Sequence, residues 1–176
     1  MTDLRIGDQL IRCDRDATVA AYLQVPHGQA NDCPCSGCRN FALLREKIYP
    51  TEFRNLLDTI GIDGNKEGEA VHYGPVEGSL HFYGGWFYFV GEIAGKGERL
   101  VEIGNLEARG FKDVKTMTGH DAHGEFQYFC SWIFPRPPAI FGSQVATLEF
   151  ATRLPWVLDT PYDPVAEAQI LKCEER

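Results

Sequence analysis

Three cysteines lie within six residues of one another in the first quarter of the chain. Cys33, Cys35 and Cys38 form a C-x-C-x2-C array, and His27 lies six positions before the first of them. Thiolates and imidazoles are ligands that Zn²⁺ prefers, and thiolates hold the ion at about 2.3 Å in a tetrahedral arrangement. A tight loop can turn several sulfur atoms inward. The array therefore predicts a zinc site with the three cysteines as ligands.

The fourth ligand of such a site has several candidates. We favour His27, because it is local and the turn at residues 31–32 can bring it round. Cys13 is the second choice. The other candidates are Cys130, Cys173, His120 and His123. Cys130 alternates with aromatic residues, which is typical of a small core residue, and we interpret Cys173 as a thiol of the tail.

The predicted zinc is structural. A catalytic zinc keeps one coordination position open for water and has an acid–base carboxylate nearby. The local carboxylates are Asp32 and Glu46, and neither falls in a catalytic spacing such as H-x-E followed by P-C-x-x-C. We therefore expect the ion to fix the loop in place.

The same cysteines allow a redox interpretation. Cys35 and Cys38 form a C-x-x-C pair at the expected start of a helix, where the helix dipole favours a thiolate. Proteins of the thioredoxin type place this pair after a strand in a β-α-β unit. The polar segment before Cys35 has no strand pattern. Thiol redox chemistry is therefore the alternative, followed by an iron–sulfur cluster.

A second polar group lies further along the chain, in the segment GHDAHGE. His120, Asp121 and His123 could bind a second metal or act in acid–base catalysis. Gly119 and Gly124 flank them and are typical of turns. A hairpin loop is therefore the favoured interpretation of this segment.

The segment HFYGGWFYFVG is the densest aromatic run. Tyr83, Trp86 and Tyr88 could grip a ligand if one face of the strand lined a cavity, with His81 and Glu92 as polar contacts. Ordinary sheet core explains most of these rings. Because alternation cannot bury all of them on a single face, we expect some to offer a binding surface for a protein or small ligand.

The composition limits the partners. The 176 residues carry 17 Lys and Arg against 25 Asp and Glu, which gives a formal net charge of −8. Nucleic acids and anionic membranes attract clustered cationic side chains, and the sequence has no such cluster. We therefore expect no nucleic-acid or membrane partner. The acidity favours a basic protein as partner.

The first residues, MTDLRIGDQLIRC, carry charges throughout and lack the apolar run of a signal peptide. No stretch of the sequence reaches the length of a membrane span. We expect a cytoplasmic protein, in which thiols stay reduced and closely spaced cysteines bind metals before they form disulfides.

Helical periodicity surrounds the cysteines. Phe41, Leu44 and Ile48 recur at i, i+3 and i+7, which predicts a helix from about residue 38 to 48. A second helix starts at Pro50 and ends at Gly61, which we expect in a left-handed conformation. Before the cysteines, the pattern indicates one strand followed by a helix over 17–23.

From about residue 69 the pattern changes to period two, which is typical of antiparallel strands. The predicted strands lie around residues 71–73, 80–90, 100–103, 126–134 and 148–150, and the pair at 84–85 predicts a bulge or kink. A last helix is expected over 162–170. Strands and helices do not alternate along the chain, so we predict an α+β fold.

We expect a single domain over residues 1–176. Residues 1–65 are mainly helical and hold the cysteine cluster, and residues 66–176 form mainly an antiparallel sheet. A chain of this length buries enough surface for one core without disulfides. The helices and the metal loop should pack on the sheet.

Four segments together resemble a family of uncharacterised bacterial proteins. They are C-x-C-x2-C-R-N-F, YPTEFRNLLDTIGID, LHFYGGWFYFVGEI with its Y-G-G-W-F-x-F-V-G strand, and LEFATRLPWVLD. The resemblance implies a bacterial protein and brings no activity with it.

The sequence thus predicts a bacterial zinc-binding protein that binds a protein or small ligand. Immunity against a nuclease toxin is one such role, since an acidic surface can occupy a basic nucleic-acid site. The alternatives are a thiol-disulfide oxidoreductase using Cys35 and Cys38, and a metal-dependent enzyme at His120 and His123. We favour a role that is not enzymatic.

Overall fold

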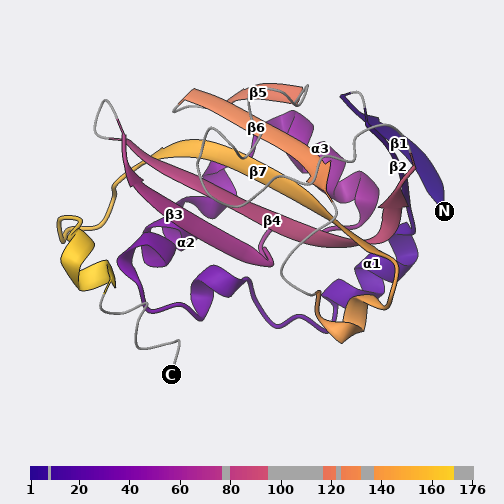
Figure 1. The fold of residues 1–176 in the computed structure, drawn as a ribbon, viewed down its shortest axis with the longest axis horizontal. Coiled ribbons are helices and arrows are strands. Elements are labelled where there is room, and N and C mark those ends of the chain that lie inside the picture. Colours follow the sequence, from indigo (N-terminus) through magenta and orange to yellow (C-terminus); the bar gives the residue numbers. More distant parts are fainter. Residues whose placement is uncertain (8, 77–79, 95–116, 122–123, 132–136, 169–176) are drawn as a thin grey trace.

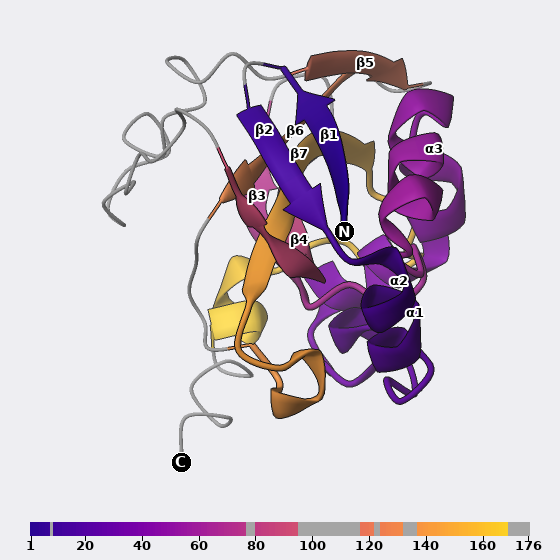
Figure 2. The same ribbon diagram turned by 90° about the vertical axis from the view of Figure 1, so that its right-hand side faces the viewer.

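Seven strands form one antiparallel sheet, and the two longest helices lie along one of its faces (Figures 1 and 2). The computed structural model describes residues 1–7, 9–76, 80–94, 117–121, 124–131 and 137–168, and it describes the side chains of all of these except 117–121 and 124–125. All statements below on the fold concern these residues. The predicted α+β class is confirmed.

Along the described sequence, two strands precede the three α-helices and five strands follow them. The strands are β1 (Thr2–Ile6), β2 (Gln9–Cys13), β3 (Glu69–Pro75), β4 (Leu80–Ile93), β5 (Met117–Asp121), β6 (Gly124–Ser131) and β7 (Val145–Pro155). The helices are α1 (Arg15–Tyr22), α2 (Ser36–Ile48) and α3 (Thr51–Ile60), with the short 3₁₀ helices η1 (Gln29–Asn31) and η3 (Ala139–Phe141).

Strand β4 is the central strand of the sheet. One edge of β4 pairs with β7 from Leu80 to Val90, and β6 and β5 follow beyond β7. The other edge pairs with β3 over residues 81–86 and with β2 over residues 91–93. The order is therefore β1-β2-β4-β7-β6-β5, with β3 beside the first half of β4.

Aromatic rings fill the layer between helices and sheet. Phe53 of α3 lies 4.8 Å from the ring of Phe126 on β6, and Phe41 of α2 stacks on Phe150 of β7 at 5.9 Å. All four rings are buried. Such pairs each contribute about 0.5–1.5 kcal/mol beyond their area burial, so they hold α2 and α3 on the sheet.

The two central helices match the sequence pattern closely. Helix α2 begins after Cys35, and α3 begins after Pro50. Gly61 ends α3 with φ of 90°, and the N–H groups of Gly61 and Ile62 both donate to the carbonyl of Leu57. The predicted left-handed glycine is confirmed.

The N-terminal segment differs from the prediction of one strand. Two strands, β1 and β2, form a hairpin, and Gly7 adopts φ of 58° between them. Ile11 and Cys13 of β2 are buried, and Ile11 pairs with Ile93 of β4. The hairpin forms because β2 extends the edge of β4, a contact that a local pattern does not encode.

Of the bulge or kink predicted at the glycine pair, the bulge is not formed. Strand β4 pairs with β7 without interruption through Gly84 and Gly85, and the register shift lies opposite, in β3. A Cβ atom on Gly85 would lie 2.5 Å from the carbonyl oxygen of Glu69 and 2.6 Å from the ring of Phe150. Glycine is needed there because the neighbours approach closely.

Strands β3, β6 and β7 lie where period two predicts them. The predicted strand at 100–103, the end of the alternation at 132–134 and the end of the last helix at 169–170 lie outside the described residues. Residues 164–168 of that helix are helical. Among the described helices, none has the length and apolar character needed to cross a membrane.

Candidate metal centre

The three clustered cysteines converge at the N-terminus of α2. The sulfur atoms of Cys33, Cys35 and Cys38 all lie within 4.8 Å of one another, and all three residues are buried. The predicted grouping of these thiols is confirmed. Their softness and spacing suit a thiophilic ion such as Zn²⁺.

Helix α2 positions two of the sulfurs. Cys35 is the N-cap of the helix, and its Sγ accepts a hydrogen bond of 3.3 Å from the backbone N–H of Cys38. The sulfur of Cys38 faces β3 and lies 3.6 Å from the carbonyl oxygen of Ala70. An N-cap side chain normally satisfies a free amide of the first turn, and here a sulfur atom does so.

The preceding turn positions the third sulfur. The N–H of Cys33 donates to the carbonyl of Gln29 at 3.2 Å, so Cys33 follows η1 directly. The cluster thus joins two segments, η1 with Cys33 on one side and α2 with Cys35 and Cys38 on the other.

The thiols polarise one another. Hydrogen bonds from the thiol of Cys38, from its backbone N–H and from the thiol of Cys33 lower the pKa of Cys35 to about 7 despite burial. Hydrogen bonding to Cys35 and burial raise the pKa of Cys38, and burial raises the pKa of Cys33. Cys35 is therefore the first of the three to become a thiolate, the form that binds metals.

Glu167 is a residue of the site that the sequence analysis missed. Its carboxylate accepts hydrogen bonds from the N–H of Gly37 at 2.8 Å, from the N–H of Ser36 at 3.1 Å and from the Ser36 hydroxyl at 2.6 Å. It is buried. A single Glu near the end of the chain carries no local signal that it caps a helix 130 residues away.

The environment of Glu167 keeps it ionised. Burial raises its pKa, but the hydrogen bonds from Ser36 and Gly37, with a further one from the Cys35 thiol, outweigh burial and hold the pKa below its usual value. The N-terminus of α2 thus faces the Glu167 carboxylate, an arrangement that the helix dipole favours.

His27 lies on the surface beside the loop. Its Nε2 is 2.5 Å from Oδ1 of Asp32, and both side chains are largely exposed, at 45% and 71%. Within the described residues, the group of donors closer than 4.8 Å consists of the three cysteines. His27 as the fourth ligand stays a prediction.

The other predicted candidates lie elsewhere or outside the described part. Cys13 on β2 donates to the carbonyl of Thr2 at 3.6 Å, and Cys130 on β6 is fully buried in the core, with its backbone bonded to Gln9. Burial raises the pKa of both thiols. Cys173 lies outside the described residues.

The described residues of the segment GHDAHGE belong to two paired strands, with 119–121 in β5 and 124–125 in β6, where the sequence predicts a loop up to residue 124. His120 of β5 pairs with Glu125 of β6, and Asp121 pairs with Gly124. The antiparallel pairing agrees with the hairpin part of the interpretation, but His120 and Asp121 lie in a strand and not in a loop. Residue 123 and the side chain of residue 120 lie outside the described part of the chain.

Tyr83, Trp86 and Tyr88, which were predicted as contacts for a ligand, do not share one face of β4. Tyr83 faces α2, where its hydroxyl donates to the carbonyl of Gly37 at 3.2 Å and accepts from Asn40. Trp86 and Tyr88 lie on the opposite face, because side chains alternate along a strand. Tyr88 packs against Phe141 instead.

An imidazole pair lies near the start of α2. Nε2 of His72 is 2.8 Å from Nδ1 of His81, and the edges of Tyr162 and the ring of Trp156 pack against both. Burial and the neighbouring His81 lower the pKa of His72 to about 4. The His72 ring is therefore neutral at physiological pH, and burial lowers the pKa of His81 as well.

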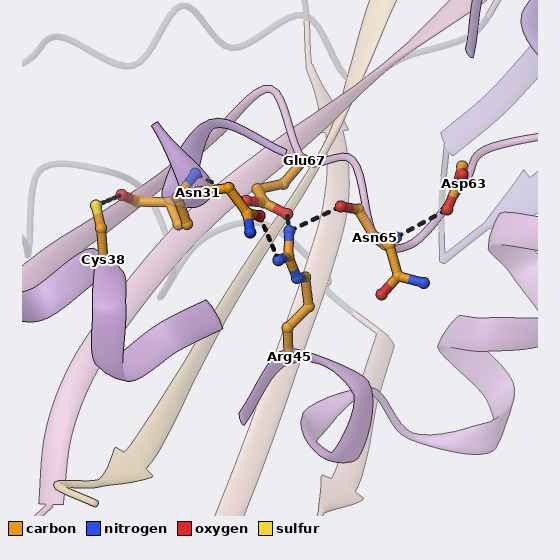
Figure 3. Close-up of polar contacts among 8 residues, drawn as sticks. Asn31, Cys38, Arg45, Asp63, Asn65 and Glu67 are labelled. Carbon is orange, nitrogen blue, oxygen red and sulfur yellow. Dashed lines mark hydrogen bonds and ion pairs between the residues drawn. The ribbon is translucent and has the colours of Figure 1, made fainter. Parts of the chain in front are cut away.

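A buried ion pair lies on the other side of the cysteine loop (Figure 3). Nη1 of Arg45 is 2.6 Å from Oε2 of Glu67, and the two side chains are 7% and 0% exposed. Figure 3 shows Arg45 reaching from α2 toward Glu67, with Asn31 and Asn65 on either side. The buried pair thus contacts both Asn31 of η1 and Asn65, the residue two positions before Glu67.

The chain matches no protein-family model, no curated protein and no solved structure. The arguments on function therefore rest on the residues and their geometry.

Proposed function

We propose that the protein binds one zinc ion through Cys33, Cys35 and Cys38, and that the ion has a structural role. The observation that carries this proposal is the convergence of three buried sulfur atoms within 4.8 Å at the start of a helix. Thiolates in this arrangement are typical of structural zinc, which joins chain segments that lack a large core of their own. Here it would join η1 to α2.

His27 remains the proposed fourth ligand. It would have to exchange its contact with Asp32 for the metal, and its exposed position leaves it free to turn. The resemblance to bacterial proteins with the C-x-C-x2-C-R-N-F motif likewise belongs to the proposal.

Metal analysis tests the site. Protein prepared without chelator should contain about one equivalent of zinc, and Cys35→Ser and Cys38→Ser should lose it. Cys130→Ala is the matched control, because it removes a buried thiol far from the cluster. Less than about half an equivalent in the parent protein, or retention of zinc in both Ser variants, would contradict the proposal.

The role served by the folded protein is proposed to be binding of a basic protein, such as a nuclease toxin in an immunity pair. The net charge of −8 supports this choice. Attraction between an acidic protein and a basic partner accelerates association and weakens as salt increases. A partner captured at low salt that is neutral or acidic would argue against it.

One observation favours a second function, thiol-disulfide exchange. The pKa of Cys35 is lowered to about 7, as in oxidoreductases that use a C-x-x-C pair. Burial of all three thiols argues the other way, since an attacking thiolate must be reached by its substrate. Disulfide reductase activity in the parent protein that is lost in Cys35→Ser would establish this alternative.

A further inference from the structure

We propose that Arg45 and Glu67 are positioning residues of the metal centre, which hold the Cys33 segment in register with the helix that carries Cys35 and Cys38. The inference rests on the proposed zinc site and adds what sets its geometry. The sequence pattern gives no indication of this role, because it places Arg45 on the predicted helix over 38–48 but does not bring Glu67 near it.

Glu67 makes two hydrogen bonds to η1 and one to Arg45 of α2. Its Oε1 accepts from the N–H of Ala30 at 3.0 Å, and its carbonyl accepts from the N–H of Gln29 at 3.1 Å. Its Oε2 accepts from Arg45 at 2.6 Å. A carboxylate with no exposed surface therefore satisfies the backbone of the turn that leads into Cys33.

Arg45 completes the connection from the side of α2. Its Nη2 donates to Oδ1 of Asn31 at 2.6 Å, and its Nη1 also donates to the carbonyl of Asn65 at 2.7 Å. The planar guanidinium thus joins α2, η1 and the segment before β3 (Figure 3). We call Arg45, Glu67 and Asn31 the brace.

Gly28 lies directly against the ion pair of the brace. A Cβ atom at Gly28 would lie 2.4 Å from Nη1 of Arg45 and 2.4 Å from each carboxylate oxygen of Glu67. Glycine at this position lets the backbone close over the ion pair, so η1 sits directly on it.

The brace connects the two parts of the thiol cluster. Arg45 lies on the same helix as Cys38, and Cys35 caps that helix. The N–H of Cys33 donates a hydrogen bond to the carbonyl of Gln29, and the N–H of Gln29 donates one to the carbonyl of Glu67. The brace therefore bridges the segment of one sulfur to the segment of the other two, without any of its atoms being a metal ligand.

Contacts like these, which hold metal ligands in place without touching the metal, influence the affinity for the metal. Loss of partners that orient metal ligands typically costs 10–100-fold in metal affinity. By reciprocity, metal binding must stabilise the brace by the same factor.

The test compares zinc affinity and the cobalt(II) absorption spectrum of the full-length protein with those of Glu67→Gln and Asn31→Ala. Glu67→Gln removes the charge opposite Arg45, and Asn31→Ala removes one acceptor with little risk to folding. Asp63→Asn is the matched control, because it removes the charge that faces Lys66 at 3.4 Å while the amide oxygen can still accept from the N–H of Asn65. Circular dichroism at low temperature confirms that each protein is folded.

We expect both brace variants to bind zinc about 10–100-fold more weakly, with an altered cobalt–thiolate band, and Asp63→Asn to match the parent. If Glu67→Gln does not fold, Asn31→Ala decides. A folded brace variant with the parental affinity and spectrum would overturn the inference and leave the zinc site standing. A parent protein that binds neither ion would overturn the proposed function itself.

Discussion

At Cys35, three donors converge on one sulfur atom. The thiol of Cys38, its backbone N–H and the thiol of Cys33 lower the pKa of Cys35 to about 7, so one thiolate is available near neutral pH. The other two cysteines must lose their protons when a metal binds, because only thiolates are metal ligands. In the metal-free protein the three sulfur atoms are thus linked by hydrogen bonds, and in the metal-bound protein they would act as ligands.

His72 gives a prediction at the scale of the residue. Its pKa of about 4 in the folded protein lies below the ordinary value of 6.5, because burial and His81 disfavour the imidazolium, while Glu167 opposes the shift. The unfolded chain therefore takes up this proton first as the pH falls. The stability contributed by neutral His72 is complete above about pH 6.5 and is lost between pH 6.5 and 4.

Urea unfolding of the parent and of His72→Gln at several pH values tests this point. The parent should lose on the order of 1 kcal/mol more than the variant between pH 6.5 and 4, a figure reduced for the partial exposure of the ring. Parallel pH profiles would show that His72 does not contribute to acid sensitivity.

At the scale of elements, α2 is held at its N-terminus by a residue from the other end of the chain. Glu167 accepts hydrogen bonds from Ser36 and Gly37, which lie between Cys35 and Cys38 in sequence. The carboxylate therefore covers the first turn of α2 and the thiol of Cys35 together. The contact of Glu167 with Ser36 and Gly37 therefore both caps the helix and buries the cysteine site.

Glu167→Ala should uncap α2 and expose Cys35. The loss of a capping carboxylate costs about 0.5–2 kcal/mol, and the Cys35 thiol should react faster with an alkylating reagent in metal-free protein. Glu46→Gln, an exposed change on the same helix, is the matched control. The measurement is the rate of alkylation at Cys35 by mass spectrometry, and equal rates in all three proteins would contradict the contact.

The elements also show what the sequence can and cannot predict. Phe53 and Ile60 recur on one face of α3 and Gly61 ends it, so all the information lies within the helix. The grouping of Cys33, Cys35 and Cys38 is predictable for the same reason, since a short loop confines them.

Contacts between distant segments are the part that the sequence does not reveal. Strand β2 has only five residues and is fixed by pairing with β4, and Gly85 is required by Phe150 across the sheet. Glu167 and Glu67 act on backbone atoms far from them in sequence. All of these contacts depend on tertiary structure, which the periodicity of hydrophobic residues does not reveal.

At the scale of the whole molecule, two kinds of core hold the chain. Aromatic rings join α2 and α3 to the sheet, as in the stacking of Phe41 on Phe150. The region from η1 to the start of α2 is held differently, by the Arg45–Glu67 pair and the thiol cluster. Metal binding should therefore stabilise that region first.

Chelation gives the prediction at this scale. A ligand that binds only the folded state at 100 times its Kd adds about 2.7 kcal/mol, so removing zinc should lower Tm by about 5–10 °C. Hydrogen exchange should rise at residues 29–38 more than in β4 and β7. The chelator should not change the Tm of Cys35→Ser, and an equal shift in that variant would show that the effect does not come from the cluster.

X-ray absorption at the zinc edge of the purified protein tests the central claim most directly, because it counts the atoms bound to the ion. The account predicts three sulfur atoms at about 2.3 Å and one nitrogen or oxygen at about 2.0–2.2 Å, with imidazole scattering if His27 is the fourth ligand. A shell of nitrogen and oxygen alone, or one with fewer than three sulfurs, would contradict the site at Cys33, Cys35 and Cys38.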